Sequence, residues 1–337
     1  MITRIDLRKS FFQCELSPDS QKYTGFSTPN GVYTYRRMAM GLRNASTTMQ
    51  KLIDHVLRNA HRYADALLDD ILIFSANFDD HLTHVKDILD RLRAAGLTVN
   101  MEKCHFATDT VKVFGHWVEK GKIYPDNDKI AVISAWEEPK TKRQLKSFVG
   151  LCSYFRSHVQ DFARIAFPLT ELLGQNKPNK LAWGPSQQTA FDTLKAALVR
   201  KPILCPPDMK KSFIIMADSS EISVSGILMQ KGDTDDEPRK VISYTSRKLL
   251  PRERRYPTIE KELLSVVYCV SKFHHYIYSR PVLIETDHRA LAYPNSLMKH
   301  SNRLARWLML LQEYDIQTKY ISGHRQLADM LTRLPHC

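Results

Sequence analysis

The segment Ala66-Leu-Leu-Asp69-Asp70-Ile-Leu-Ile-Phe74 places two adjacent acids between two short apolar runs. This pattern predicts a strand, a tight turn and a second strand, with Asp69 and Asp70 at the tip of the hairpin. Two neighbouring carboxylates between apolar strands must be solvated, ion-paired or bound to a metal ion. Taken alone, the pair is more simply interpreted as a polar turn that closes a buried hairpin.

A third acid changes this interpretation. Asp6 ends the apolar segment Ile2-Thr-Arg-Ile5, so a strand that pairs beside the hairpin would bring three carboxylates to one sheet edge. Such a cluster repels itself unless divalent cations lie within it, and oxygen ligands suit Mg2+ or Mn2+. Two such ions in a chain with a net charge of +13 indicate phosphoryl transfer on nucleic acid.

The composition sets the broad class of the protein. The 337 residues are 43% hydrophobic and 25% charged, which excludes a wholly disordered or collagen-like chain and favours two or three domains. The six cysteines form no CxxC pair, so we expect reduced thiols and no zinc site. Because neither a signal peptide nor a membrane span is evident, we expect a cytoplasmic or nuclear protein without a membrane partner.

The second half of the sequence carries four further acids. Asp218 and Asp287 each end an apolar strand, Glu262 lies in the first turns of a helix, and Asp329 lies in the last predicted helix. Taken singly, they are best interpreted as strand-end acids, a solvated helix face and a cap. The predicted order is three strands, a helix, a strand, a helix, a strand and a helix, at 212–217, 224–229, 240–245, 257–276, 281–286, 301–312, 315–321 and 325–333.

Several motifs together resemble a known family. The segments 6–13, 40–50 and 68–74 are similar to the palm motifs of reverse transcriptases from gypsy-type LTR retrotransposons, and 96–104 and 114–116 are similar to their later palm and primer-grip motifs. Tyr256-Pro-Thr-Ile-Glu-Lys-Glu262-Leu-Leu and 303–315 resemble the ribonuclease H segment of the same elements. On these motifs the chain is identified as a fragment of such a Pol polyprotein.

The resemblance implies a multidomain α+β and α/β fold. We expect a reverse transcriptase palm at 1–135, a thumb or connection region at 136–208, and a ribonuclease H-like mixed five-stranded sheet with helices at 209–337. The family places a fingers segment before the position of Asp6, and this sequence begins close to that residue, so we expect feeble primer extension. Glycines of the family appear here as Ser223 and Ser225, which predicts poorer packing against the sheet.

The same resemblance implies the site residues. Seven acids would be catalytic and would hold two Mg2+ or Mn2+ ions per active site: Asp6, Asp69, Asp70, Asp218, Glu262, Asp287 and Asp329. Seven residues would bind substrate: Phe11, Gly41, Gln50, Lys103, Lys142, Arg143 and Lys146. All of these except Gly41 also have a simpler interpretation: core packing for Phe11, a helical surface residue for Gln50, a surface lysine for Lys103 and a solvated helix face for Lys142, Arg143 and Lys146.

The implied function is reverse transcription coupled to ribonuclease H activity. The chain would synthesise DNA on RNA or DNA templates from deoxynucleoside triphosphates and would hydrolyse RNA in RNA:DNA hybrids. Its partners would be primer–template, hybrid, and other Pol or Gag products of the element. The alternative from another class is a catalytically inactive remnant that binds nucleic acid, and cleavage of a labelled hybrid separates the two.

Overall fold

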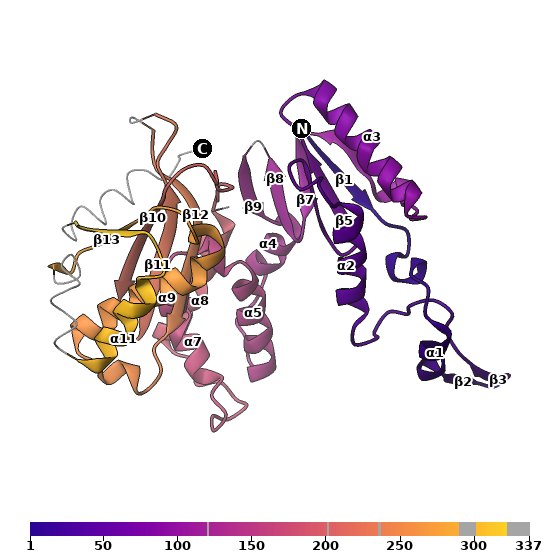
Figure 1. Cartoon of the computed structure of the whole chain (residues 1–337). Helices are drawn as coiled ribbons and strands as arrows, with labels where there is room; N and C mark the ends of the chain where they lie inside the picture. The colour runs from indigo at the N-terminus through magenta and orange to yellow at the C-terminus, as the bar shows by residue number, and fades with distance from the viewer. Residues whose placement is uncertain (120, 201, 235–236, 290–300, 322–337) are drawn as a thin grey trace. The chain divides into compact units, whose positions relative to one another are not determined.

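The computed structural model describes residues 1–119, 121–200, 202–234, 237–289 and 301–321. It divides the chain into two compact units, Met1–Lys120 and Gly121–Cys337, which are taken separately below (Figure 1). The finer predicted boundaries after residues 135 and 208 stay a prediction.

The first unit is built on a four-stranded sheet in the order β4-β5-β1-β6. Its strands are β1 (Ile2–Asp6), β4 (Ala64–Leu67), β5 (Asp70–Phe74) and β6 (His105–Thr108). The central pair, β1 and β5, is antiparallel and sets Ile5 opposite Ile71 and Asp6 opposite Asp70. The strand–turn–strand predicted from the acid pair is therefore present, and the Asp6 strand pairs directly with it.

Helices α2 (Ala45–Val56) and α3 (Phe78–Ala94) cover one face of this sheet (Figure 1). The core between them holds large side chains from every layer: Ile5, Met49, Ile53, Ile71, Ile73, Ile88 and Leu92. Asn77 caps α3 by accepting a hydrogen bond from the Asp80 amide at 2.9 Å. The apolar spacing of residues 79–95 predicts that Leu82 faces inward, but this is wrong, because His81 occupies the inward position and Leu82 is 54% exposed.

The remaining parts of the first unit are short. They are η1 (Ser10–Gln13), α1 (Pro18–Gln21), η2 (Lys22–Thr24), β2 (Phe26–Thr28), β3 (Gly31–Tyr33), η3 (Met101–Lys103), β7 (Thr110–Val113) and β8 (His116–Glu119). The predicted hairpin around Pro29-Asn30-Gly31 is confirmed as the antiparallel pair β2–β3. Strands β7 and β8 form a second antiparallel hairpin that the sequence pattern did not predict.

The second unit begins with a helical region that has a core of its own. Its elements are β9 (Lys122–Pro125), α4 (Asn127–Ser134), α5 (Lys142–Tyr154), η4 (Arg156–His158), α6 (Phe162–Ile165), α7 (Phe167–Leu172) and α8 (Pro185–Val199). Thr141 and Gln144 form a capping box that starts α5, and its apolar face is buried as predicted. Helix α8 was not predicted, although Pro185 at its start and a buried Phe191 are its sequence signals.

A five-stranded sheet in the order β12-β11-β10-β13-β14 follows. The strands are β10 (Phe213–Ser219), β11 (Ser223–Gln230), β12 (Lys240–Lys248), β13 (Val282–Thr286) and β14 (Ile316–Tyr320), with η5 (Glu253–Arg255), α9 (Thr258–Ile277) and α11 (Asn302–Leu311) between them. Pairing is antiparallel from β12 to β10 and parallel from β10 to β14, so the predicted mixed five-stranded sheet is confirmed. The predicted helix 325–333 lies outside the described residues.

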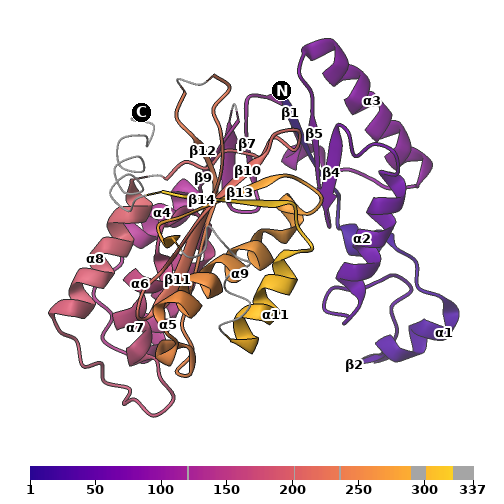
Figure 2. The same cartoon turned by 60° about the vertical axis from the view of Figure 1, so that its left-hand side comes forward.

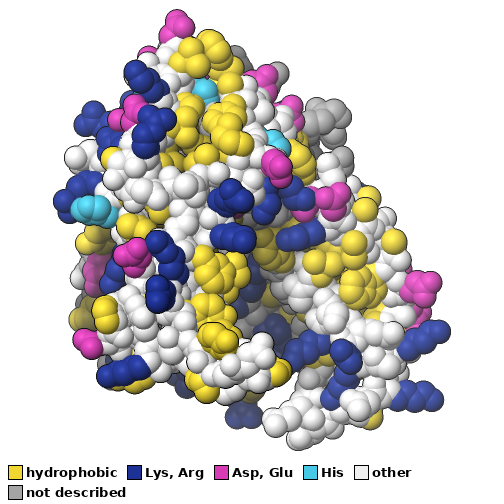
Figure 3. Space-filling model, turned by 90° about the vertical axis from the view of Figure 1, so that its right-hand side faces the viewer, with side chains coloured by type: hydrophobic (Ala, Val, Ile, Leu, Met, Phe, Trp, Pro, Cys, Tyr) yellow, Lys and Arg dark blue, Asp and Glu magenta, His cyan; other side chains and the backbone are white. Residues whose placement is uncertain are grey.

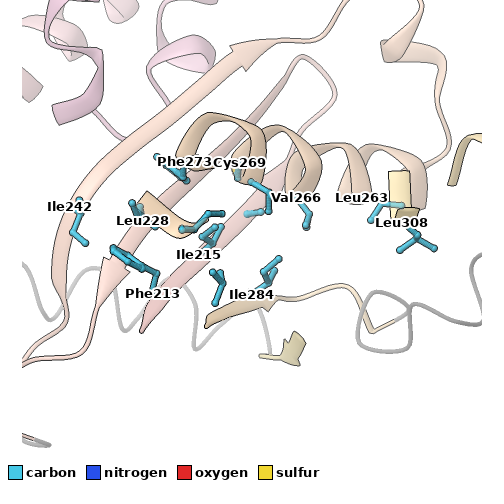
Figure 4. Close-up of a cluster of buried hydrophobic side chains, with 14 of the residues drawn as sticks. Phe213, Ile215, Leu228, Ile242, Leu263, Val266, Cys269, Phe273, Ile284 and Leu308 are labelled. Carbon is cyan, nitrogen blue, oxygen red and sulfur yellow. The ribbon is translucent and has the colours of Figure 1, made fainter. Parts of the chain in front are cut away.

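Helix α9 packs along one face of this sheet, with α11 beside it (Figure 2). Phe213, Ile215 and Ile284 on the strands interlock with Val266 and Phe273 on α9 (Figure 4). The alternate strand residues form a second cluster, Ile214, Met216, Ile227 and Met229. The two faces of the sheet are therefore distinct, and side chains of the same parity share a face.

Gly226 is required by the close approach of α9 to β11. A Cβ atom at this position would lie 2.2 Å from the Cys269 sulfur and 2.9 Å from the Met216 carbonyl oxygen. Ser223 and Ser225, by contrast, are buried at 4% and 8% exposure, and neither has a positive φ. The expectation that these serines impair packing is wrong, because their backbone is ordinary strand.

Among the described residues, no helix is both long and apolar enough to cross a membrane.

Candidate active sites

Three acids of the first unit meet at one end of its sheet. Asp6 ends β1 opposite Asp70 on β5, and Asp69 lies in the turn between β4 and β5. Leu68 takes a positive φ of 58° in that turn, and the Leu7 amide donates to the Asp69 carbonyl oxygen at 3.1 Å. Because Asp6 and Asp70 alternate with the core residues Ile5 and Ile71, they lie on the sheet face opposite the helices.

This first centre contains its own cations. The Arg4 guanidinium donates from Nε and Nη2 to Asp70 Oδ1 at 2.9 and 2.7 Å. Burial raises the pKa of Asp6, while Lys103 opposes that rise and the carboxylates of Asp69 and Asp70 add to it. The three acids are therefore in mutual electrostatic contact, and two of them have a basic neighbour.

Gln50 connects helix α2 to the hairpin that carries the acid pair. Its amide nitrogen donates to the Ala66 carbonyl oxygen at 3.1 Å, and its amide oxygen accepts from the Leu68 amide at 2.8 Å. The sequence analysis assigned Gln50 to substrate contact. In the structure its side chain holds the turn that presents Asp69, so it positions the acids.

The other substrate-binding residues predicted for the first unit occupy three different settings. Phe11, in η1, is half-buried against the unit's core. Gly41 is exposed and has a φ of 89°, a backbone conformation that favours glycine. Lys103, at the end of η3, is exposed and acts electrostatically on Asp6.

The second acid centre lies at the ends of two parallel strands. In the parallel pair β10–β13, Phe213 lies opposite Val282 and Met216 lies opposite Glu285. Two residues further along the same register, Asp218 corresponds to Asp287. Asp218, on β10, shares the parity of Met216, whereas Asp287 directly follows the last residue of β13. The family resemblance implies a shared metal site for these two acids, and that assignment stays a prediction.

Glu262 reaches the same centre from the first turns of α9. Ser219 Oγ donates to its Oε1 atom at 2.7 Å, whereas the buried Oε2 atom has no hydrogen-bond partner. Burial and the carboxylates of Asp218 and Asp287 raise the pKa of Glu262 to about 7 against the lowering effect of Ser219. The carboxylate is therefore desolvated and incompletely compensated.

Asp218 is also perturbed, although the residue remains exposed. Desolvation, Asp161 and Asp287 raise its pKa to about 6. Glu260 lies two residues before Glu262 on α9, but it is paired with the Arg303 guanidinium and accepts from Ser301 Oγ at 3.2 Å. The structure thus separates an acid engaged in an ion pair, Glu260, from one directed to the centre, Glu262. Asp329 lies outside the described residues.

The donor chemistry of the second centre fits a hard divalent cation. Its ligands would be carboxylate oxygens, and the unpartnered Oε2 of Glu262 is a buried acceptor that a cation would satisfy. Within the described ranges, no three His, Cys, Asp or Glu side chains lie close enough together to hold a metal ion.

The basic face of α5 is only partly available to a ligand. The Lys142 ammonium donates to the Gly174 carbonyl oxygen at 2.9 Å and also to the Lys177 carbonyl oxygen. Arg143 and Lys146 are exposed on the same helix. Lys and Arg side chains also occur in several groups on the face of the molecule shown in Figure 3, mixed with apolar and acidic ones.

Comparison with known proteins matches two segments of the chain to described families. Residues 1–118 match the family described as reverse transcriptase (RNA-dependent DNA polymerase), and residues 208–314 match the RNase H-like domain found in reverse transcriptase. The predicted resemblance is confirmed for these two segments.

Curated relatives extend the match along the whole chain. A retrovirus-related Pol polyprotein from transposon 297 of Drosophila melanogaster is 35% identical over 335 residues, which is 98% of this chain and 31% of the relative. The transposon Tf2-3 polyprotein of Schizosaccharomyces pombe is 30% identical over 99% of this chain and 25% of its own length. The chain therefore spans a third or less of these relatives.

Two solved structures share the fold. A foamy viral protease–reverse transcriptase in complex with RNA/DNA hybrid matches 96% of this chain and 44% of its own with a TM-score of 0.83 and 20% identity. The same kind of protein in complex with dsDNA matches 96% of this chain and 67% of its own with a TM-score of 0.82 and 20% identity. The predicted fold, a reverse transcriptase domain followed by an RNase H-like sheet, is confirmed.

Proposed function

We propose, from the premise that residues 1–118 belong to the reverse transcriptase family and residues 208–314 to the RNase H-like domain found in reverse transcriptases, that this chain acts on nucleic acid at both acid centres. The first would extend a DNA primer on an RNA or DNA template. The second would hydrolyse the RNA strand of an RNA:DNA hybrid. The observation that carries the proposal is the buried, unpartnered Oε2 of Glu262 beside Asp218 and Asp287.

The hydrolytic centre has the stronger support. Asp218, Glu262 and Asp287 would hold Mg2+ or Mn2+, with Asp329 as the fourth predicted ligand, and two such ions supply charge neutralisation and an activated water in phosphodiester hydrolysis. Ser219 fixes one oxygen of Glu262 through its 2.7 Å hydrogen bond. The second oxygen is left without a hydrogen-bond partner, so it would be free to bind a cation, while Ser219 restrains the carboxylate.

At the polymerase centre, Asp6, Asp69 and Asp70 would hold two divalent ions. Gln50 fixes the turn that carries Asp69, and Lys103 is placed near Asp6, where it would contact the triphosphate or donate a proton. Phe11 would lie beneath the incoming sugar and Gly41 beside the template. Arg4 holds Asp70 and would have to share it with a cation.

The predicted three-part organisation belongs to this proposal. Residues 136–208 would act as thumb and connection, and Lys142, Arg143 and Lys146 on α5 would contact phosphates of primer–template. Phosphate contacts carry no base information, so this binding would tolerate any sequence. Deoxynucleoside triphosphates and other Pol or Gag products of the element would be the further partners.

The test is cleavage of an RNA:DNA hybrid labelled on its RNA strand. The chain should cut the RNA in Mg2+ or Mn2+ and not in EDTA. Glu262→Gln should abolish cutting while hybrid binding is retained, because a metal ligand is lost and the phosphate contacts remain. Glu260→Gln is the matched control on the same helix, and it should still cut. Binding without any cleavage by the parent chain would instead support an inactive, nucleic-acid-binding remnant.

A further inference from the structure

A segment that precedes the matched RNase H-like residues lies directly on their sheet. Residues 156–165 contact strand β12 through Ser246, whose hydroxyl oxygen accepts from the Ala163 amide at 2.9 Å and whose carbonyl oxygen accepts from the Arg156 guanidinium. Phe162 and Ala163 are buried, at 4% and 7% exposure. The segment is therefore fixed to the sheet and is not a loose connection.

The register of the sheet places this segment on the side that carries Asp218. Ser246 on β12 lies directly opposite Ser225 on β11, and Ser225 lies directly opposite Asp218 on β10. Residues directly opposite in antiparallel strands point to the same face, and two strand spacings are about 10 Å. The segment that contacts Ser246 is therefore separated from Asp218 by strand β11 alone, and it lies on the face of the sheet that carries Asp218.

Two charged side chains of the segment act on the centre. Asp161 is, after burial, the next contributor to the raised pKa of Asp218, and Arg164 acts in the opposite direction. Burial, and after it the charge of Asp161, raise the pKa of Tyr244 on the same face. The ion pair formed by Asp161 and Arg164 is therefore within electrostatic reach of the carboxylates.

The geometry of this pair is asymmetric. Arg164 Nη2 donates to Asp161 Oδ2 at 2.9 Å, and the two side chains are 57% and 16% exposed. The acid is mostly covered and the guanidinium is mostly open to solvent. A second pair of the same spacing, Arg93 and Asp90 on α3, has 83% and 53% exposure and a 3.3 Å contact, so both of its members project into water.

We propose that Arg164, held by Asp161, binds a backbone phosphate of the nucleic-acid strand presented to the second acid centre. A guanidinium offers a planar fork of donors that matches a phosphate, and a charge-assisted contact of this kind is short and directional. A strand carries a phosphate about every 3.4 Å along the helix axis, so a strand cut at Asp218 brings neighbouring phosphates past residue 164. The substrate surface of the hydrolytic centre then extends into a segment that lies before the matched domain.

This inference rests on the proposed hydrolytic function, and a salt titration of hybrid binding separates the two. The affinity of the full chain for a fluorescent RNA:DNA hybrid is measured against salt concentration without divalent ions. Arg164→Ala should reduce the slope of log affinity against log salt by about 0.7 to 0.9, the value for one phosphate contact, and Arg164→Lys should keep the slope. Arg93→Ala, the matched control, should also keep the parent slope.

Cleavage kinetics in Mg2+ supply the second measurement. Arg164→Ala should raise KM for the hybrid about 3- to 10-fold and change kcat less, because a phosphate contact is made in both the bound and reacting states. Asp161→Asn removes a negative charge near a polyanion, so if Asp161 acted only by repulsion, KM for the hybrid would fall. If Asp161 holds Arg164 in place for the phosphate, KM for the hybrid should rise, and this rise is the result that we expect.

The outcomes are distinguishable. A parent chain that binds hybrid and never cuts it overturns the proposed hydrolysis, whereas the salt slopes still decide the role of Arg164. A parent chain that cuts, together with an Arg164→Ala variant of unchanged slope and KM, overturns the phosphate contact alone. The melting temperature of each variant shows whether it is folded, and the Arg164→Lys variant tests the contact with the charge retained.

Discussion

The two acid centres use the same chemical groups but differ in how directly basic side chains contact the carboxylates. At the first, Arg4 binds Asp70 directly and Lys103 opposes the raised pKa of Asp6. At the second, Glu262 is buried with an unpartnered oxygen, and its pKa is raised to about 7. The difference shows that carboxylates gathered at the end of a sheet can be compensated to different extents. At the first centre a guanidinium contacts one carboxylate directly, whereas at the second a buried carboxylate oxygen has no hydrogen-bond partner.

The largest effect should come from replacing one carboxylate of the second centre by an amide, with the same replacement at the first centre as the control. Asp218→Asn should lower the rate of hybrid cleavage by at least roughly 100-fold, because it removes a predicted metal ligand of the hydrolytic centre. Asp69→Asn, made in the other unit, should leave that rate unchanged. The measurement is cleavage of labelled RNA in Mg2+. Equal losses in both variants would show that the two centres are not independent.

Gly226→Ala should have the next largest effect, confined to the second unit. The added methyl group would lie 2.2 Å from the Cys269 sulfur, which forces α9 away from β11. We expect a loss of about 1 to 3 kcal/mol in the free energy of unfolding, the usual cost of overpacking. Amide hydrogen exchange should show lost protection in α9 and unchanged protection in α3. Unchanged protection throughout would mean that the sheet adjusts without cost.

Arg4→Met tests the internal cation of the first centre. The side chains of Arg4 and Asp70 are 22% and 18% exposed, so removal of the guanidinium leaves a half-buried carboxylate without its partner. We expect a cost of about 1 to 2 kcal/mol without metal. Mg2+ should then raise the melting temperature of the variant more than that of the parent. Arg4→Met combined with Asp70→Asn is the control, and the extra response to Mg2+ should disappear in it.

Mild acid should destabilise the first unit through His81. The ring is 1% exposed, and its Nε2 and Nδ1 atoms lie 2.7 Å from Thr3 Oγ1 and 3.0 Å from Ser75 Oγ. Burial lowers the pKa of His81 below its ordinary value of 6.5. The folded state therefore binds this proton less readily than the unfolded state, so its stabilising contribution is present above pH 6.5 and is lost as pH falls.

The measurement is hydrogen exchange of α3 as a function of pH, corrected for the intrinsic exchange rate. The loss per pH unit cannot exceed about 1.4 kcal/mol for one proton. His81→Asn should flatten the dependence. A dependence that is identical in the variant would assign the acid sensitivity to other groups.

Lys142→Ala should have the smallest effect. Its ammonium already donates to two backbone carbonyls, so it resembles Arg4 in being engaged within the protein. Arg143→Ala and Lys146→Ala should each flatten the salt slope of primer–template binding by about 0.7 to 0.9, and Lys142→Ala by much less. A full contribution from Lys142 would show that nucleic acid displaces the carbonyls.

Most of the architecture could be predicted from the sequence because it depends on local pattern. The apolar runs that end in Asp6, Asp218 and Asp287 are read directly as strands with an acid at one end, and the spacing of apolar residues gives α2, α5 and α9. Parallel or paired strands then bring their ends together, which gives both acid centres. The pattern failed at Leu82, where His81 takes the inward position because polar partners are available to it.

The sequence by itself determined that Asp6, Asp218 and Asp287 each follow an apolar strand, whereas the tertiary structure decided which carboxylates come together and how each is compensated. Arg4 and Asp70 are 66 residues apart, and no periodicity marks them as an ion pair. The same holds for Gln50 at the acid-pair turn, for Glu260 with Arg303, and for Arg164 near Asp218. The physical reason is range: strand and helix signals arise from neighbours in the chain, but the charge balance of a buried group is set by whatever the complete fold places beside it.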